Sequence, residues 1–427
     1  MATSVSARRR LLGSMVAAGV LVGSIATPAA AVRGPIQGAP LLYSLHGDET
    51  TVNYGWAIAE LHDINGDGVT DLITGDPFRG AGPQAYVYSG ATGDPLFTWD
   101  GPAGEFYSYA IADSGDTNGD DVSDVLIGNP GDGNPNPGSV ELRSGADGTL
   151  LHTFLGDQTN SEFGTAVASA GDVDGDGNDD VLIGAETSDG PAGSQAGRAL
   201  IFSGDDFALI RTLNGQEPNQ LLGSGADLAG DLDGDGTRDH VIGARGLTTG
   251  GSVLAFSGAT GELLWRFDGH AGSSELGSFF VAGLEDVNGD GTPDVYGADY
   301  ADTSNGPSSG AAFVLSGVDG SPIHTWTGRA GDGLGPGREA GDIDRDGVQD
   351  LAVGTYLNSS RATRSGQVQI RSGRTGEIIG RIKSRIGGEN LGFDAVGLGD
   401  VDGDGRDDLA LSAASGNSVY VVSGAID

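Results

Sequence analysis

Apolar and polar residues follow the same order in seven successive stretches of the chain. Each stretch opens on an aromatic residue or leucine with small apolar residues, such as FGTAVASA at 163–170, and runs into an acidic block. A short apolar run ending in glycine follows, such as VLIGA at 181–185. After a variable loop, an alternating segment closes on Ser-Gly, and a tight turn leads to a last segment such as LLWRF at 263–267. This order predicts four short β-strands in each stretch and little helix.

The repeat is regular, because successive acidic blocks begin 53, 56, 59, 55, 56 and 58 residues apart. A period near fifty that is rich in glycine and short strands is typical of a propeller. The seventh stretch ends after its third strand, and Leu41–Glu49 resembles the missing fourth one. If this amino-terminal segment completes the last blade, the ring closes and two exposed sheet edges are removed. The sequence therefore predicts an all-β, seven-bladed β-propeller closed by an amino-terminal strand, in preference to an open array.

The first residues have the features of an export signal. Arg8–Arg10 precede a mildly apolar stretch at Leu11–Ala26, and Ala29–Ala31 offers an A-x-A cleavage site, so the mature chain is expected to begin at Val32. The arginines also loosely resemble a twin-arginine signal, so both the Sec and the Tat route stay open. We therefore expect a secreted, extracellular or periplasmic protein, divided into a signal peptide at 1–31, a linker at 32–40 and the propeller at 41–427.

Charge narrows the range of partners. The formal charge is −38, with a single lysine in the whole chain. Nucleic acid and anionic membranes are poor partners for such a chain because their phosphates are repelled, and no stretch after the signal is apolar enough for membrane insertion. The chain has no cysteine, so stability outside the cell has to come from something other than disulfide bonds.

The acidic blocks have the residue types of a calcium loop. Each carries Asp at positions 1, 5 and 9 and Asp or Asn at position 3, and most have glycine at position 6, where the backbone turns sharply. These oxygen-only donors fit a hard cation of the size of Ca²⁺, with Mg²⁺ ranked second and no sign of a zinc or iron site. The sequence predicts up to seven structural Ca²⁺ ions, in the loops at 63–71, 116–124, 172–180, 231–239, 286–294, 342–350 and 400–408.

The predicted ligands stand at positions 1, 3, 5, 7 and 9, with position 7 offering its backbone carbonyl. They are Asp63, Asn65, Asp67, Val69 and Asp71; Asp116, Asn118, Asp120, Val122 and Asp124; Asp172, Asp174, Asp176, Asn178 and Asp180; Asp231, Asp233, Asp235, Thr237 and Asp239; Asp286, Asn288, Asp290, Thr292 and Asp294; Asp342, Asp344, Asp346, Val348 and Asp350; and Asp400, Asp402, Asp404, Arg406 and Asp408.

The acidic blocks have two alternative interpretations. An EF-hand needs a glutamate at position 12, where the third loop has Ile183 inside a strand. The other alternative is a set of Asp/Gly turns that hold themselves with Asx hydrogen bonds and bind nothing. We expect loops two and six to bind most weakly, because Asp121 replaces the glycine at position 6 of loop two and Arg345 replaces the glycine at position 4 of loop six.

The Phe-Gly opening, the D-x-D-x-D-G-x-x-D loop and runs such as LIGNP at 126–130 resemble the FG-GAP repeats of the integrin α-subunit propeller. The resemblance covers roughly residues 41–427, although several units have Leu-Gly or Tyr-Ser in place of Phe-Gly. It implies a calcium-binding propeller whose ligands use the face opposite the calcium loops. On that face the resemblance directs attention to the loops at 299–310 and 355–366, and Tyr300, Tyr356, Arg361 and Arg364 are the candidate ligand contacts.

We found no catalytic constellation in the sequence. GPSSG at 306–310 matches G-x-S-x-G by letters, but it lies in a Ser/Pro/Gly loop without the helix that a nucleophile elbow needs. The favoured interpretation is a non-enzymatic adhesion module for an extracellular protein or polysaccharide. A structural envelope or matrix protein without a specific ligand is the main alternative. An extracellular polysaccharide-acting enzyme with its site in the central channel is the third.

Overall fold

The structure is a computed structural model that describes residues 34–131, 135–246, 250–270 and 275–426. The signal peptide and the cleavage point expected at 1–32 lie outside these residues. Pro35–Asp427 forms one compact unit, and apart from a 3₁₀ turn at Ala414–Gly416 its described regular elements are β-strands.

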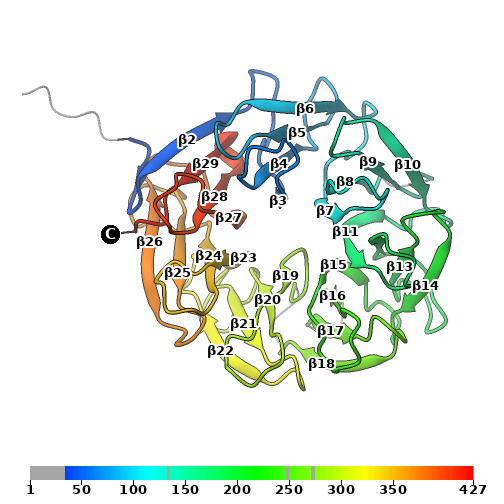
Figure 1. Ribbon diagram of the computed structural model, residues 1–427. Coiled ribbons are helices and arrows are strands. Elements are labelled where there is room, and N and C mark those ends of the chain that lie inside the picture. The colour runs from blue at the N-terminus through cyan, green and yellow to red at the C-terminus, as the bar shows by residue number, and fades with distance from the viewer. Residues whose placement is uncertain (1–33, 132–134, 247–249, 271–274, 427) are drawn as a thin grey trace, which may run out of the picture. The chain divides into compact units, whose positions relative to one another are not determined.

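Seven antiparallel sheets surround a common axis, with the first strand of each repeat innermost and the fourth towards the outside (Figure 1). This is the seven-bladed β-propeller that the repeat predicted, with four strands in each repeat. Blades one to three contain β3 (Ile58–Leu61), β4 (Asp71–Asp76), β5 (Gln84–Tyr88) and β6 (Pro95–Asp100); β7 (Ile111–Gly115), β8 (Asp124–Asn129), β9 (Ser139–Arg143) and β10 (Leu150–Leu155); and β11 (Phe163–Gly171), β12 (Asp180–Ala185), β13 (Arg198–Phe202) and β14 (Leu209–Asn214).

The remaining blades repeat this order. Blades four to seven contain β15 (Leu222–Leu228), β16 (His240–Ala244), β17 (Ser252–Phe256) and β18 (Leu263–Asp268); β19 (Val281–Gly283), β20 (Val295–Asp299), β21 (Ala311–Leu315) and β22 (Pro322–Thr327); β23 (Leu334–Gly341), β24 (Asp350–Thr355), β25 (Gln367–Arg371) and β26 (Ile378–Ser384); and β27 (Ala395–Gly399), β28 (Asp408–Ala413) and β29 (Ser418–Val422), completed by β2 (Leu41–His46).

The ring is closed by the amino-terminal strand, as the sequence predicted. β2 pairs antiparallel with β29, from Leu41 opposite Val422 to His46 opposite Ser418. Leu45 is buried in a cluster that joins blade seven to blade one. The segment expected as a linker also contributes to the fold, since Ile36 and Gln37 form β1, which pairs with the outer strand β26 of blade six. Blade six therefore has five strands.

The core is divided among the junctions between blades. Seven clusters of buried apolar residues occur, and each joins two neighbouring blades, including blades seven and one. Trp99, Trp265 and Trp326 on fourth strands belong to these clusters, and each indole N–H donates to a backbone carbonyl of the next blade, on Gly148, Gly317 and Gly376 respectively. The interpretation of these tryptophans as contacts between blades is confirmed.

The Ser-Gly signature has a steric cause. A Cβ atom on Gly90 would lie 1.8 Å from the carbonyl oxygen of Thr70, and one on Gly204 would lie 2.2 Å from that of Asp179. The equivalent glycines of the other five blades meet a backbone oxygen at 1.9 to 2.0 Å. The chain after the third strand therefore packs directly against the end of the acidic loop, and only glycine fits there.

Candidate functional site: seven aspartate loops and an aromatic ring

Each acidic block lies between the first and second strands of its blade, all at the same end of the propeller. The third loop, between β11 and β12, shows the common arrangement. The backbone N–H of Gly177 donates to Asp172 Oδ2 (3.1 Å), that of Asn178 to Asp176 Oδ1 (2.8 Å), and that of Val173 to Asp180 Oδ2 (2.8 Å).

The same three bonds recur in every loop. Position 6 donates to position 1 in all seven. Position 7 donates to position 5, and position 2 donates to position 9. Such Asx-type bonds hold the turn by themselves, so they fix the positions of the carboxylates before any cation arrives.

The aspartate at position 9 connects the loop to the third strand. Its side chain is fully buried in each blade, and Oδ1 accepts a hydrogen bond from the glycine of the Ser-Gly signature. In the third blade this bond joins Gly204 to Asp180 at 3.1 Å. The other six pairs are Gly90–Asp71, Gly145–Asp124, Gly258–Asp239, Gly317–Asp294, Gly373–Asp350 and Gly424–Asp408.

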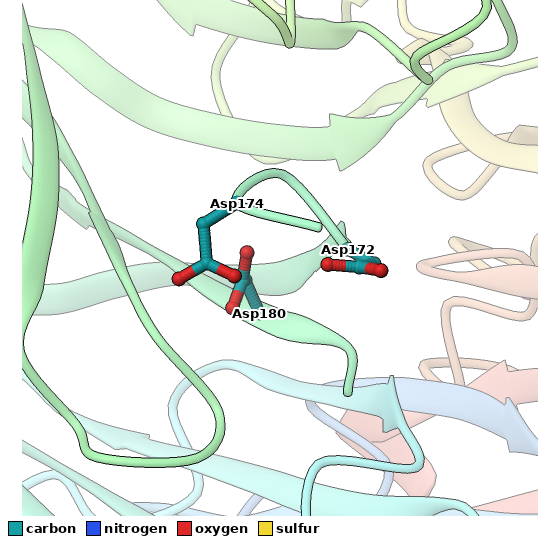
Figure 2. A group of neighbouring side chains, drawn as sticks. All are labelled: Asp172, Asp174 and Asp180. Atoms are coloured by element: carbon teal, nitrogen blue, oxygen red, sulfur yellow. The ribbon is translucent and has the colours of Figure 1, made fainter. Parts of the chain in front are cut away.

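Carboxylates converge in the four loops that have aspartate at position 3. Figure 2 shows Asp172, Asp174 and Asp180 gathered beneath the third turn, and one oxygen from each lies within 4.8 Å of the others. The same holds for three further groups of described residues, which are Asp231, Asp233 and Asp239; Asp342, Asp344 and Asp350; and Asp400, Asp402 and Asp404.

The three loops with asparagine at position 3 bring the same positions together differently. The side-chain amides of Asn65, Asn118 and Asn288 donate to the aspartate at position 9 of their own loops, at 3.0 to 3.3 Å. Positions 3 and 9 are therefore neighbours in these loops as well. The amide reduces the local negative charge, which favours weaker cation binding than an aspartate at the same position would.

The two unusual loops keep the common backbone course. Asp121 at position 6 of the second loop has φ +66°, and Arg345 at position 4 of the sixth has φ +64°, both in the left-handed region that glycine occupies at these positions elsewhere. An arginine at such a φ is strained, whereas aspartate tolerates it better. Arg345 Nη2 donates to the carbonyl oxygen of Asp404 in the seventh loop, so its charge is held between two acidic loops.

The electrostatics of the loops favour a bound cation. Burial raises the pKa of Asp180 from its ordinary value of 3.8 to about 6, and the charges of Asp174 and Asp176 act in the same direction. Burial likewise raises the pKa of Asp350 to about 7. A divalent cation would favour the ionised form of such carboxylates. The donor set contains only carboxylate, amide and carbonyl oxygens, which is the chemistry of a Ca²⁺ site.

These shifts predict an unusual pH dependence for the cation-free protein. Burial raises the pKa of Asp71, Asp124, Asp239 and Asp294 to about 6 as well. Since the folded chain retains protons that the unfolded chain releases, the resulting stability is fully present below about pH 4 and is lost as the pH rises through about 6. We expect protein stripped of cations to melt at a higher temperature near pH 5 than near pH 7.5, measured by calorimetry.

The control is the same comparison in calcium, where the trend should reverse because protons compete with the ion for the carboxylates. His240 opposes the effect, since burial lowers its pKa to about 4 and its protonation at low pH favours unfolding. A cation-free protein that loses stability from about pH 7.5 to 5 would contradict the prediction.

The opposite end of the propeller carries a closed ring of aromatic side chains. All come from the connections between second and third strands or between successive blades. Neighbouring ring centroids lie 4.8 to 6.4 Å apart around the circuit. We call it the aromatic ring; its members are Trp56, Phe78, Phe106, Tyr109, Phe279, Phe280, Tyr300, Tyr356 and Phe393, all partly exposed except Phe280, which is buried.

Two of the four predicted ligand contacts belong to this ring. Tyr300 and Tyr356 meet edge to face at 6.4 Å. Arg361 and Arg364 are exposed in the loop between β24 and β25 and are not part of the ring. The remaining members were missed, although three follow a recurring signal, because Trp56, Tyr109 and Phe393 each stand two residues after the aromatic or leucine that opens a repeat.

A cavity of about 90 Å³ lies at the ring, lined by Trp56, Tyr109, Phe279 and Phe393 with Arg338 and Asp394 among its other lining residues. A larger cavity of about 680 Å³ lies on the side of the aspartate loops and is lined by acidic side chains that include Glu60, Asp113, Asp227 and Glu339. Burial raises the pKa of Glu339 well above its usual range.

The G-x-S-x-G match has no catalytic setting. Residues 306–310 lie in the loop between β20 and β21, where Ser308, the serine of the match, is exposed. No helix follows this loop, since β21 begins at Ala311. The loop therefore lacks the strand–turn–helix of a nucleophile elbow.

A seven-bladed propeller with an aspartate loop between the first two strands of every blade defines the structural class. Comparison with known proteins agrees with it. The FG-GAP repeat family matches residues 163–202. The chain is 36% identical to integrin alpha-5 of Xenopus laevis over 217 residues, and 29% identical to integrin alpha-V of Gallus gallus over 224 residues. Each match covers 47% of this chain.

These matches and the seven-bladed fold support the resemblance of the repeats to an FG-GAP, integrin α-like β-propeller. The matched region amounts to 20% and 21% of those two integrin subunits, so the chain corresponds to about a fifth of their length. Within the described residues, no helix has the length and apolar character needed to cross a lipid bilayer.

Proposed function

We propose that this protein is a secreted adhesion module, stabilised by Ca²⁺ in its aspartate loops, which binds an extracellular protein or polysaccharide over the aromatic ring. The single observation that carries the proposal is the ring itself. Eight partly exposed aromatic side chains meet around one end of the axis, and they come from connections rather than from the strands that build the core. Aromatic residues concentrated on an exposed surface are typical of binding sites.

The calcium part of the proposal rests on the convergent carboxylates. All thirty-five positions predicted from the repeat remain the proposed ligand set. The all-aspartate loops three, four and seven are proposed as the strongest sites, and loop six as a weaker one because Arg345 brings a positive charge into it. The ions are proposed to stabilise the scaffold, because the loops lie at the end of the propeller away from the aromatic ring. In this proposal Arg361 and Arg364 are contacts at the margin of the binding surface.

The test is a binding screen of the mature chain on arrayed extracellular proteins and glycans, in calcium and in chelator. We expect calcium-dependent capture of one ligand class, reduced about tenfold or more by Trp56→Ala and by Tyr356→Ala, since interface aromatics carry much of the binding free energy. Phe207→Ala is the matched control, because Phe207 is a partly exposed aromatic in the hairpin between β13 and β14 at the opposite end.

Capture that Trp56→Ala and Phe207→Ala weaken equally would contradict binding over the ring. Absence of capture would favour a structural envelope or matrix protein. Turnover of an arrayed glycan would favour an enzyme whose site is the cavity lined by acidic side chains on the side of the aspartate loops.

A further inference from the structure

Blade six reverses the charge of the rest of the chain. Residues 351–388 contain seven arginine or lysine residues and one acidic residue, Glu377, within a chain of formal charge −38. The seven cations are Arg361, Arg364, Arg371, Arg374, Arg381, Lys383 and Arg385. The only lysine of the protein is among them. The net charge of this segment is therefore positive, whereas that of the whole chain is strongly negative.

Several of these cations line one groove between blades five and six. The groove has a volume of about 430 Å³. It is lined by Arg329, Arg371, Arg381 and Lys383, together with amide and hydroxyl side chains. Its one carboxylate, Asp332, accepts from Asn358 Nδ2 and from a backbone N–H, and pairs with none of the four cations. Within the described residues these four form no ion pair at all.

Strand pairing explains why the cations share a face. In β25 the polar residues Gln367, Gln369 and Arg371 alternate with apolar ones, so they lie on one side of the sheet. Lys383 of β26 is directly opposite Gln367, and Arg381 is opposite Gln369. The side of blade six that faces blade five is therefore built from two glutamines and three cations.

In blade two, the arginine at the end of the third strand has a carboxylate partner. Arg143, the last residue of β9, lies over the ring of Trp99 at 5.2 Å and pairs with Glu141 at 2.7 Å. Arg371, the last residue of β25, lies over the ring of Trp326 at 4.6 Å in the same way. Its neighbour at the position of Glu141 is the neutral Gln369.

Arg371 is consequently a buried cation that forms no ion pair with any described residue, although the charge of Glu377 acts on it. Its side chain is 9% exposed, Nη1 donates to Gly376 O and Nη2 donates to Gln369 Oε1, and Nε has no hydrogen-bond partner among the described residues. Burial lowers its pKa to about 10. Burial also lowers the pKa of Lys383, and the positive charges of Arg361 and Arg381 act in the same direction.

Blade four provides a second comparison. Arg266 lies opposite the middle residue of β17, as Arg381 lies opposite the middle residue of β25. Arg266 forms ion pairs with Glu217 and Asp268. At the place of Asp268, blade six has Lys383. Two carboxylates that neutralise arginines in other blades are thus replaced here by a glutamine and a lysine.

We propose that this groove binds an anionic polysaccharide, with a sugar carboxylate or sulfate held by Arg371, Arg381 and Lys383. Charge complementarity requires an anion, and guanidinium groups bind planar carboxylates and sulfates well. The polar lining of glutamine, asparagine and hydroxyl groups suits sugar hydroxyls better than the apolar side chains of a peptide. This site is separate from the aromatic ring and does not depend on the proposed function of that ring.

The experiment is a calorimetric titration of the mature, calcium-loaded protein with galacturonate oligosaccharides and, separately, with heparin oligosaccharides, at low salt. The two arms distinguish carboxylate from sulfate as the recognised group, and a neutral dextran oligosaccharide is the blank. We expect binding in at least one anionic arm. Gln369→Glu, which installs the carboxylate found in blade two, and Arg381→Gln should each weaken it about tenfold or more.

Arg266→Gln is the matched control, since it removes an equal charge at the equivalent place in blade four, and it should leave binding unchanged. Gln369→Glu is expected to melt at or above the temperature of the unsubstituted protein, because it gives Arg371 a partner, so lost binding cannot be attributed to unfolding. Trp56→Ala should bind the oligosaccharides normally.

Three results would overturn the proposal. They are no binding of either anionic oligosaccharide, an equal loss of binding in Arg266→Gln, and binding of a poly-glutamate peptide in place of both oligosaccharides. The last would identify the groove as a site for an acidic protein.

Discussion

Transfer of the mature protein from millimolar calcium into chelator is expected to lower its melting temperature by at least about 10 °C. Any ion that binds only the folded chain stabilises it, by roughly 4 kcal/mol for each site at a thousandfold excess over its Kd. The effect should be large here because the described structure contains no cysteine and seven loops of concentrated negative charge. Calorimetry in calcium, in magnesium and in chelator measures it.

The same experiment can assign the effect to a particular loop. Asp174→Asn converts the third loop to the composition of the first, second and fifth, and should reduce the calcium-dependent part of the stability only modestly. Asp172→Ala removes the carboxylate that accepts the N–H groups of Gly175, Asp176 and Gly177, and should reduce it more. An unchanged melting curve in chelator would show that these are cation-free Asx turns.

Deletion of residues 35–46 is expected to abolish the folded monomer. It removes β1 and β2, exposes the five residues of β29 along a free edge, and takes Leu45 out of the cluster between blades seven and one. An unpaired edge of this length favours association between chains. Sedimentation should therefore detect aggregates, and circular dichroism should detect a loss of β-structure.

Two point substitutions on β2 test how much its buried side chain contributes to the free energy of unfolding. Leu45→Ala should lower the free energy of unfolding by about 2–5 kcal/mol because Leu45 is buried. Leu41→Ala on the same strand should change it little, since Leu41 is 37% exposed. A deletion variant that stays monomeric and melts like the full chain would contradict closure by β2.

The fold was predictable because the residue pattern of a single blade occurs seven times along the chain. The acidic block, the apolar run and the Ser-Gly turn each correspond to a fixed place in the blade. Because all seven copies keep this order, they predict the same four-stranded unit seven times. Even the amino-terminal strand that completes blade seven could be predicted, because Leu41–Glu49 resembles the fourth strands of the other repeats. β1 could not, since two residues paired with β26 leave no pattern in the sequence.

The sites were predictable to different degrees. The aspartates are neighbours along the chain, so their convergence follows from local turn geometry. The aromatic ring joins single residues from different blades, and only Tyr300 and Tyr356 were recognised in advance. Arg361 and Arg364 were recognised as exposed cations in the loop between β24 and β25. The basic groove could not be predicted, because its cations come together only through the pairing register of β25 and β26. Which cations lack a partner there is visible only in three dimensions.

The pairing of β2 with β29 also sets the order in which this protein is completed. Leu41 is made long before its partner Val422, which lies in the third strand of the seventh repeat. Contacts this distant in sequence form slowly because a very long loop has to close. The first six blades can assemble while synthesis continues, but β2 has to wait without its partner strand until the seventh repeat has been made. Ring closure is therefore the final step in the folding of the propeller, and a chain interrupted before residue 418 lacks the strand with which β2 pairs.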